Sequence, residues 1–178
     1  LLQLMADVTS RVNAQLLEMK LSHHTHRKNL KHTILLGSPT RLRQIMLNLF
    51  SNAIKYNKPG GSISIHAKII RQVHQNVIYK FIISDTGIGI SLEFQKHIFE
   101  PFAQEDTGAR TIYKGTGLGM AIVHRLVQEM GGTIQLKSEK NVGSTFTLIL
   151  PFTIDEHQPS ASAETATDTP ADLTDLHI

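Results

Sequence analysis

Two neighbouring runs of alternating apolar and polar residues constrain the fold of this chain more than any other feature. Apolar side chains occupy every second position from Ile63 to Ile69 and again from Val77 to Ile83. This period of two is typical of strands that bury one face of a sheet. The polar connection at 71–76 predicts that the two strands form an antiparallel pair. The apolar face of such a pair requires a covering layer.

Helical patterns elsewhere in the chain supply that layer. Apolar residues recur at helical spacing from Leu1 to Met19. A second helix is predicted to begin after Ser38, because a hydroxyl is a good N-cap and Pro39 suits the first helical position. The expected helices cover 1–19, 39–56, 92–98 and 118–130, and the expected strands cover 29–36, 63–69, 77–83, 133–138 and 144–150. This alternation predicts the α/β class, with one sheet and helices packed on it.

Charge divides the chain into a basic body and an acidic end. Residues 155–178 hold six acidic residues and no Lys or Arg, which leaves 18 basic and nine acidic residues in 1–154, a net charge of +9. The end is rich in Ala, Ser, Thr and Pro, so it buries too little apolar surface to fold. We expect one domain over 1–154 and a disordered linker or tail over 155–178. The basic body indicates an anionic ligand, either nucleic acid or a polyphosphate, or simply a basic soluble surface.

Composition excludes several classes of site. The chain has no cysteine, which rules out disulfide frameworks, thiolate zinc sites and cysteine nucleophiles. Its apolar runs are far shorter than the roughly 18 residues of a membrane helix. Because it starts at Leu1 without a signal segment, we interpret the chain as a fragment of a longer protein, and we expect this fragment itself not to be embedded in a membrane.

Two asparagines form the first candidate site. Asn48 and Asn52 are four residues apart on the expected helix, so both project from one face, with Lys55 and Tyr56 near its end. Their carboxamide oxygens suit a hard cation such as magnesium, and Lys55 adds positive charge for a phosphate. The spacing alone leaves open that both asparagines are solvated surface residues, although Asn is a poor helix former.

The second candidate site follows the strand that ends near Ile83. Asp85 is followed by Gly87, Ile88, Gly89 and Ile90. The glycines let the backbone turn tightly, and the carboxylate can accept a hydrogen bond from an exocyclic amine such as that of adenine. An ordinary strand-to-loop turn is the alternative. An aspartic protease would need a second Asp-Thr-Gly sequence, which the chain lacks.

The third candidate site is a glycine-rich loop at the start of a helix. Residues 115–119 read Gly-Thr-Gly-Leu-Gly, so backbone N–H groups there can approach a phosphate. Their spacing matches neither a P-loop nor a dinucleotide fingerprint. The preceding loop carries Arg110 and Lys114, and we interpret it as a mobile basic lid. Phe99 and Phe102 are candidates for its anchor, or they are simply core residues.

Histidines gather near the N-terminus, where His23, His24 and His26 lie close to His32. Imidazole is a common metal ligand, but no carboxylate lies nearby in the sequence to orient such a site. We therefore expect no native metal site there.

Five motifs, taken in their order along the chain, resemble the motif set of one protein family. They are residues 48–53 (Asn-Leu-Phe-Ser-Asn-Ala), 85–89 (Asp-Thr-Gly-Ile-Gly), 98–102 (Ile-Phe-Glu-Pro-Phe), 115–119 (Gly-Thr-Gly-Leu-Gly) and 143–146 (Gly-Ser-Thr-Phe). In this order they resemble the N, G1, F, G2 and G3 boxes of the catalytic and ATP-binding domain of bacterial-type sensor histidine kinases, in the GHKL superfamily. The resemblance implies a Bergerat-type two-layer α/β sandwich, a mixed sheet with helices on one face.

The resemblance also implies roles at the phosphate end of an ATP site. Asn52 would coordinate magnesium with Asn48 in support, and these two residues and Lys55 would be the catalytic group. Lys55 and Arg110 would approach the phosphates. Backbone N–H groups of the 115–119 loop would contact the phosphate chain.

At the base end, the resemblance implies that Tyr56 packs near the nucleoside and that Asp85 binds the adenine amino group. Gly87 and Gly89 would make room for the base. Asn141 stands where the family often has glycine, and Asn tolerates positive φ better than most residues. The implied ATP-binding residues are Asn48, Asn52, Lys55, Tyr56, Asp85, Gly87, Ile88, Gly89, Ile90, Phe99, Phe102, Arg110, Lys114, Gly115, Thr116, Gly117, Leu118, Gly119 and Thr145.

The implied reaction is transfer of the γ-phosphoryl group of Mg-ATP to a histidine. That histidine is expected on a helical dimerisation domain of the same parent protein, because His23 and His24 lie inside the matched domain. The acidic stretch after Phe152 fits a hybrid kinase with a response-regulator receiver domain, or a bare tail. We expect a homodimeric parent, a monomeric fragment and a cytoplasmic location, with the parent either free or anchored in the inner membrane.

Other functions remain open from the sequence. Gyrase B, the ninety-kilodalton heat-shock chaperone and mismatch-repair ATPases share the fold and use a glutamate base at the position of Asn48. Because a carboxamide cannot take a proton from water, Asn48 favours a kinase over a dedicated ATPase. A serine or protein kinase of this fold and a catalytically weak nucleotide-binding regulatory module are further alternatives. Nucleic-acid binding is not expected, since no recognition motif accompanies the basic charge.

Overall fold

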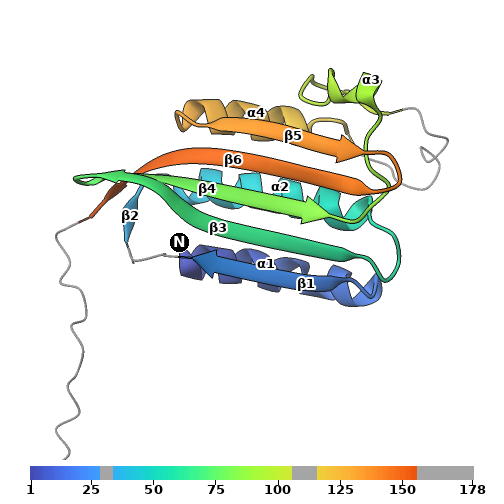
Figure 1. The fold of residues 1–178 in the computed structure, drawn as a ribbon, viewed down its shortest axis with the longest axis horizontal. Coiled ribbons are helices and arrows are strands. Elements are labelled where there is room, and N and C mark those ends of the chain that lie inside the picture. Colours follow the sequence, from blue (N-terminus) through green and yellow to red (C-terminus); the bar gives the residue numbers. More distant parts are fainter. Residues whose placement is uncertain (29–33, 106–115, 156–178) are drawn as a thin grey trace, which may run out of the picture.

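The computed structural model describes residues 1–28, 34–105 and 116–155. Its elements are α1 (Leu2–Glu18), β1 (Ser22–Lys28), β2 (Leu35–Leu36), α2 (Pro39–Lys55), β3 (Ser62–Val73), β4 (Asn76–Asp85), α3 (Leu92–Gln95), α4 (Gly119–Glu129), β5 (Thr133–Glu139) and β6 (Gly143–Ile154). Within these residues the strands form a single sheet, and α1, α2 and α4 cover one of its faces (Figure 1). This arrangement confirms the predicted α/β fold.

The sheet is mixed, as expected. Its strands follow the order β1-β3-β4-β6, and the far edge of β6 pairs with β5 at one end and with β2 at the other. Only β1 and β3 run parallel among the described pairings. The predicted antiparallel pair is confirmed, with Ile65 opposite Ile83 in the register of β3 and β4.

The core lies between the sheet and its helices. The alternating residues of β3, β4 and β6 point to the helical side, where they are buried against the apolar stripes of α1, α2 and α4. The largest fully buried side chains are Tyr79, Phe50, Phe81, Ile45, Met46, Leu49, Ile63, Ile65, Ile83, Leu148, Leu150 and Val8. Burial of this apolar surface holds the two layers together.

Local signals explain where α2 begins and how α1 meets it. The Ser38 Oγ accepts a hydrogen bond from the Arg41 backbone nitrogen at 3.3 Å, which confirms the predicted N-cap. Arg43 on α2 donates to the Asp7 carboxylate on α1 at 2.8 Å. This contact ties the two helices on the same face of the sheet.

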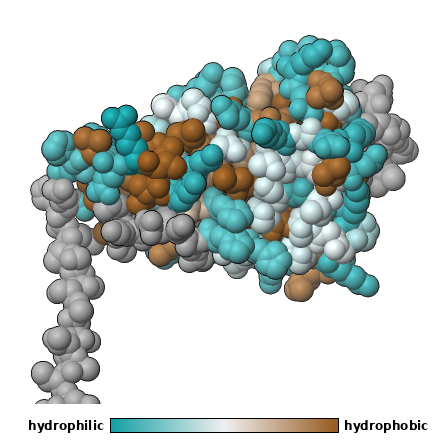
Figure 2. Space-filling model, viewed as in Figure 1, coloured by the Kyte–Doolittle hydropathy of each residue, from teal (hydrophilic) through white to brown (hydrophobic). Residues whose placement is uncertain are grey.

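The opposite face of the sheet is not covered by a described helix, and it carries basic side chains together with isoleucines such as Ile78, Ile82 and Ile149. His66 and Lys68 on β3 are exposed there, and the ring of His66 stacks on that of His26 with centroids 4.5 Å apart. Lys68 lies directly opposite Lys80 on β4. Figure 2 shows hydrophilic and hydrophobic residues mixed over this side of the molecule.

The first strand differs from the prediction. Extended chain was expected over 29–36, where the structure has the short strand β2 at Leu35–Leu36 and residues 29–33 lie outside the described part. The strand at Ser22–Lys28 was not expected. Strand β1 has no apolar alternation to signal it, because histidine replaces the expected apolar residue on the inner side. The His23 ring lies 5.9 Å from the Phe50 ring, between centroids.

Other element ends also differ. The connection expected at 71–76 is shorter, because β3 continues to Val73 and β4 begins at Asn76. Strand β6 continues through Pro151 to Ile154, beyond the expected end at 150. Proline is tolerated there because the pairing with β5 ends at Ile149 and the pairing with β2 starts at Thr153, so no described strand flanks that edge. The helix expected over 92–98 is confined to Leu92–Gln95, although Ser91 caps it as predicted.

Candidate nucleotide-binding site

A cavity of about 310 Å³ opens at the end of the sheet where β4 stops. It lies between the C-terminal half of α2, the loop after β4, the segment after α3 and the start of α4. Its lining residues are Ser51, Asn52, Ala53, Lys55, Tyr56, Asp85, Ile88, Gly89, Ile90, Phe94, Ile98, Ala103, Gln104, Glu105, Thr116, Gly117, Gly119, Met120, Ser144 and Phe146. The cavity therefore unites residues from the second and third predicted sites with part of the first.

Helix α2 supplies a polar and basic wall. Asn52, Lys55 and Tyr56 line the cavity, and the Lys55 ammonium lies 4.8 Å from the centroid of the Tyr56 ring. Asn48 is one turn earlier on the same face, and its Nδ2 is buried without a hydrogen-bond partner among the described residues. A Cβ atom on Gly119 would lie 3.8 Å from Asn48 Oδ1, so the asparagine faces the start of α4.

Asp85 supplies an acidic group at the opposite wall. Burial raises the pKa of Asp85, and hydrogen bonds from the backbone of Gly87 and Ser144 oppose that rise. The Gly87 amide donates to Asp85 Oδ1 at 2.9 Å. A half-buried carboxyl group held in this way is a hydrogen-bond acceptor for a ligand in the cavity.

The loop after β4 packs between the end of α2 and the β5–β6 turn. The Ile88 amide donates to the Tyr56 carbonyl at 3.0 Å, and the Asn141 amide donates to the Ile88 carbonyl at 2.7 Å. At Gly89, where φ is +64°, an added Cβ would lie 1.9 Å from the Glu139 carbonyl oxygen. Glycine is therefore required at this position for steric and conformational reasons.

The glycine-rich loop before α4 also packs closely, in this case against the backbone of Phe102. Gly117 has a φ of +69°, and an added Cβ would lie 2.7 Å from the Phe102 carbonyl carbon. The Leu118 amide donates to Thr116 Oγ1 at 3.4 Å just before α4 begins. The start of α4 thus lies beside the cavity, where its first N–H groups can face an anion.

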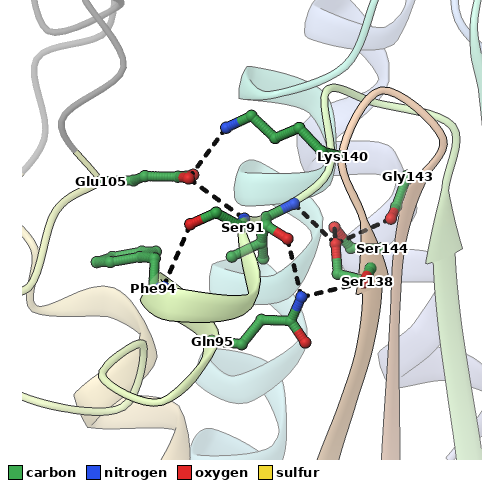
Figure 3. A network of polar contacts seen from close by, with 9 residues as sticks. Ser91, Phe94, Gln95, Glu105, Ser138, Lys140, Gly143 and Ser144 are labelled. Carbon is green, nitrogen blue, oxygen red and sulfur yellow. Dashed lines mark hydrogen bonds and ion pairs between the residues drawn. The ribbon is translucent and has the colours of Figure 1, made fainter.

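A polar network links the loop after β4 to α3 and to the β5–β6 hairpin (Figure 3). The Ser138 Oγ accepts from the Ile90 amide at 2.8 Å and contacts the Ser144 Oγ at 2.9 Å. Gln95 Nε2 donates to the carbonyl oxygens of Ile90 and Ser138 at 2.8 and 3.0 Å. Helix α3 is thereby fixed to the β5–β6 hairpin.

Comparison with known proteins identifies this arrangement. A profile of the family described as "Histidine kinase-, DNA gyrase B-, and HSP90-like ATPase" matches residues 37–154. The chain belongs to this family. The match runs from the start of α2 to the end of β6, so it includes every residue that lines the cavity. The resemblance stated from the five motifs is confirmed.

The relatives of this histidine kinase-like ATPase domain include much longer proteins. The circadian input-output histidine kinase CikA of Synechococcus elongatus is 44% identical over 115 residues, which are 65% of this chain and 15% of CikA. Hybrid signal transduction histidine kinase A of Dictyostelium discoideum is 44% identical over 133 residues, covering 71% of this chain and 6% of the relative. The chain thus spans a small part of either protein.

The fold also matches solved histidine kinase structures. The crystal structure of full-length ShkA in complex with AMPPNP superposes with a TM-score of 0.71 at 30% identity, covering 86% of this chain and 30% of that one. This likeness agrees with the two-layer arrangement described above.

Several predicted site residues lie away from the cavity lining of the histidine kinase-like ATPase domain. The Phe99 ring stacks on His124 of α4 with centroids 5.0 Å apart, and Phe102 is 73% exposed. Thr145 contacts Ser84 through their hydroxyl groups at 2.9 Å. Asn48, Gly87 and Leu118 adjoin the lining without belonging to it, and Arg110, Lys114 and Gly115 lie outside the described residues.

The sequence interpretation missed part of the lining. Ser144 is buried beside Asp85, whereas its neighbour Thr145 was predicted. The alternation of β6 could have found it, because even-numbered residues such as Phe146 and Leu148 face the helices. The segment containing Glu105 has no pattern that indicates a site.

His23, His24 and His26 lie on β1, away from the cavity lining, and His32 lies outside the described residues. Burial and the charge of His24 lower the pKa of His23. No group of three or more metal-ligating side chains forms within residues 1–28, 34–105 and 116–155. No helix in those ranges is long and apolar enough to cross a membrane.

Proposed function

We propose that this domain binds ATP with magnesium in the cavity and transfers the γ-phosphoryl group to a histidine on a separate helical dimerisation domain. The observation that carries the proposal is the convergence of an acid, a lysine, an asparagine and a glycine-rich helix start on one cavity. Phosphoryl transfer depends mainly on positioning the phosphates and compensating their charge. These side chains supply both requirements.

The base end of the proposed site is the wall formed by Asp85 and the loop after it. The carboxylate would accept a hydrogen bond from the adenine amino group. The room that the resemblance assigns to Gly87 and Gly89 has a different basis in the structure, because the missing side chains let this loop pack against the Tyr56 and Glu139 carbonyl groups. Ile88 and Ile90 offer apolar contact from the lining. An acceptor in an apolar slot selects a planar base with an exocyclic amine.

The phosphate end of the proposed site is the region between Lys55 and the start of α4. Lys55 would neutralise phosphate charge, while backbone N–H groups at Gly117 and Gly119 would donate to phosphate oxygens. The roles proposed for Arg110, Lys114 and Gly115 concern residues outside the described part and rest on their sequence.

The magnesium implied by the resemblance fits the available donors. Asn52 lines the cavity, and its carboxamide oxygen is the kind of ligand that magnesium takes. The buried Nδ2 of Asn48 has no partner among the described residues and is a donor for an oxygen acceptor, not a ligand for the ion. Magnesium is usually held by a few protein oxygens, with phosphate oxygens and waters in the other positions. Asn52 would hold it and Asn48 would orient Asn52. When bound, the ion would offset phosphate charge.

Asn48 supports a kinase over an ATPase. By the family resemblance, hydrolytic relatives use a glutamate at this position to activate water. The carboxamide of Asn48 accepts no proton, so the γ-phosphoryl group would be kept for transfer to a protein histidine.

The proposed partners follow from the relatives. One of them is named a hybrid signal transduction kinase, which supports a receiver domain as a partner of this domain. We propose a helical dimerisation domain of the same parent protein as the phosphoacceptor, a homodimeric parent, a monomeric fragment and a cytoplasmic site of action. ShkA was crystallised with AMPPNP, which supports ATP as the ligand here.

A phosphate-release assay together with a transfer assay tests this function. The chain is incubated with ATP and magnesium, alone and with a histidine-bearing dimerisation domain from its parent. We expect negligible phosphate release by the chain alone and acid-labile labelling of the added domain, and we expect the labelling to be lost in Asn52→Ala. Rapid phosphate release without labelling would replace the kinase with an ATPase.

A further inference from the structure

One wall of the cavity has no regular secondary structure of its own. Ala103, Gln104 and Glu105 line the cavity after α3, where no helix or strand is assigned. On one side, the backbone of Phe102 abuts Gly117 so closely that a Cβ atom would not fit. The side-chain contacts of Glu105 add to this backbone packing.

Glu105 provides such contacts through its carboxylate. Glu105 Oε1 accepts a hydrogen bond from the Ser91 amide at 3.2 Å and one from Lys140 Nζ at 3.0 Å (Figure 3). The Glu105 side chain is 19% exposed and that of Lys140 is 42% exposed. One carboxylate thus joins three separate parts of the chain, the 103–105 wall, the cap of α3 and the β5–β6 turn.

The Lys140 side of this contact is itself anchored. Asn141, the next residue in the turn, donates its amide to the Ile88 carbonyl at 2.7 Å, and its carbonyl accepts from Lys58 Nζ at 2.5 Å. Asn141 has a φ of +66°, in agreement with the predicted tolerance for positive φ. The turn is therefore fixed both to the segment after α2 and to the loop that carries the proposed base contact.

The electrostatics favour a charged carboxylate in this position. Burial raises the pKa of Glu105, but hydrogen bonds from Ser91 and Lys140 outweigh burial, so the pKa is below its usual value. Exposed ion pairs contribute little because water competes for them. This pair differs because a partly buried carboxylate also accepts a backbone amide, and charge-assisted bonds of this kind are stronger.

We infer that Glu105 and Lys140 are positioning residues that hold the 103–105 wall closed against the nucleotide cavity. This inference rests on the proposed nucleotide binding. With the pair intact, the wall is preorganised before a ligand arrives. Without it, binding must also order the wall, which weakens affinity. Neither residue is assigned a direct role in phosphoryl transfer.

Calorimetry with AMPPNP and magnesium tests the inference on the full chain. Glu105→Gln and Lys140→Met are each expected to raise the Kd about three- to tenfold, and the double variant is expected to be no weaker than the worse single variant. Lys140→Arg should restore most of the affinity. Lys96→Met is the matched control, because Lys96 forms a similar ion pair with Glu93 outside the cavity lining.

A second readout separates positioning from general stability. Hydrogen exchange at the Ser91 amide should accelerate in Glu105→Gln, while the thermal midpoint stays near that of the parent chain because the pair is partly exposed. Unchanged affinity in both single variants, or additive losses in the double variant, would overturn the inference while leaving nucleotide binding intact. A parent chain that binds no AMPPNP would overturn the proposed function itself.

Discussion

The amide nitrogen of Gly87 lies 2.9 Å from Oδ1 of Asp85, so the carboxylate that faces the cavity is held by the loop that follows it. The two residues sit at the end of β4, where the register with β6 also brings Ser144 opposite Asp85. A side chain at position 87 would collide with the Tyr56 carbonyl oxygen, since an added Cβ would lie 2.3 Å from it. The hydrogen bond from Gly87 and the close packing of this loop together hold the Asp85 carboxylate at the cavity.

Asp85→Asn should separate binding from stability. Burial raises the pKa of Asp85, so the folded chain holds its proton more tightly than the unfolded chain does. The stabilisation that protonated Asp85 gives the folded chain is therefore fully present below the pKa that this group has in the unfolded chain. It is lost as the pH rises from that value through the higher pKa of the folded chain. Urea unfolding at neutral pH should show Asp85→Asn to be as stable as the parent chain or more stable. A less stable variant that only matches the parent at acidic pH would contradict this sign.

Gly89→Ala should destabilise the loop and impair the cavity. The substitution combines a positive φ with a clash against the Glu139 carbonyl, so we expect a loss of about 2–4 kcal/mol in the free energy of unfolding. Gly60→Ala is the matched control, because Gly60 also has positive φ but open space around it. The control should lose only about 1 kcal/mol. Equal losses in chemical denaturation would show that the close approach at Gly89 has no energetic effect.

Tyr79→Phe should leave stability unchanged or increase it slightly. The Tyr79 hydroxyl is buried in the core without a hydrogen-bond partner among the described residues. Removing an unsatisfied buried polar group is expected to gain up to about 1 kcal/mol. The ring stacking on Phe81 is kept. A loss above about 1 kcal/mol in thermal or urea unfolding would indicate that the hydroxyl has a partner, such as a buried water.

Lys68→Glu should stabilise the uncovered face of the sheet at low salt. Lys68 lies directly opposite Lys80, and like charges in this position are unfavourable. We expect a gain of about 0.5 kcal/mol that shrinks as added salt screens the charges. Lys137→Glu is a useful comparison, since Lys137 lies opposite the uncharged Thr145. An equal gain in stability in both variants would show that the gain comes from the change in net charge and not from removal of the Lys68–Lys80 repulsion.

The fold was predictable where one face of an element is uniformly apolar. The alternation in β3 and β4 fixed their pairing, and Ser38 with Pro39 fixed the start of α2. Strand β1 escaped prediction because its inner position is His23, so its place in the sheet depends on tertiary pairing with β3.

The site was predictable where a few closely spaced residues of distinctive type, such as an acid followed by glycines, form part of it. Asp85 and the glycines around it carried a strong local signal, and they line or adjoin the cavity. Glu105 carried none, because its importance comes from a turn 35 residues away in sequence. Long-range contacts of this kind become visible only once the chain is folded.

Isothermal calorimetry of the chain with ATP and magnesium, beside Asp85→Asn, tests the central proposal most directly. We predict saturable binding by the parent chain, no sustained heat of hydrolysis, and an affinity at least about tenfold lower in Asp85→Asn, the factor that ~1.4 kcal/mol represents. Equal binding by both chains would contradict the assignment of Asp85 to the base. Absence of binding by the parent chain would contradict the nucleotide site as a whole.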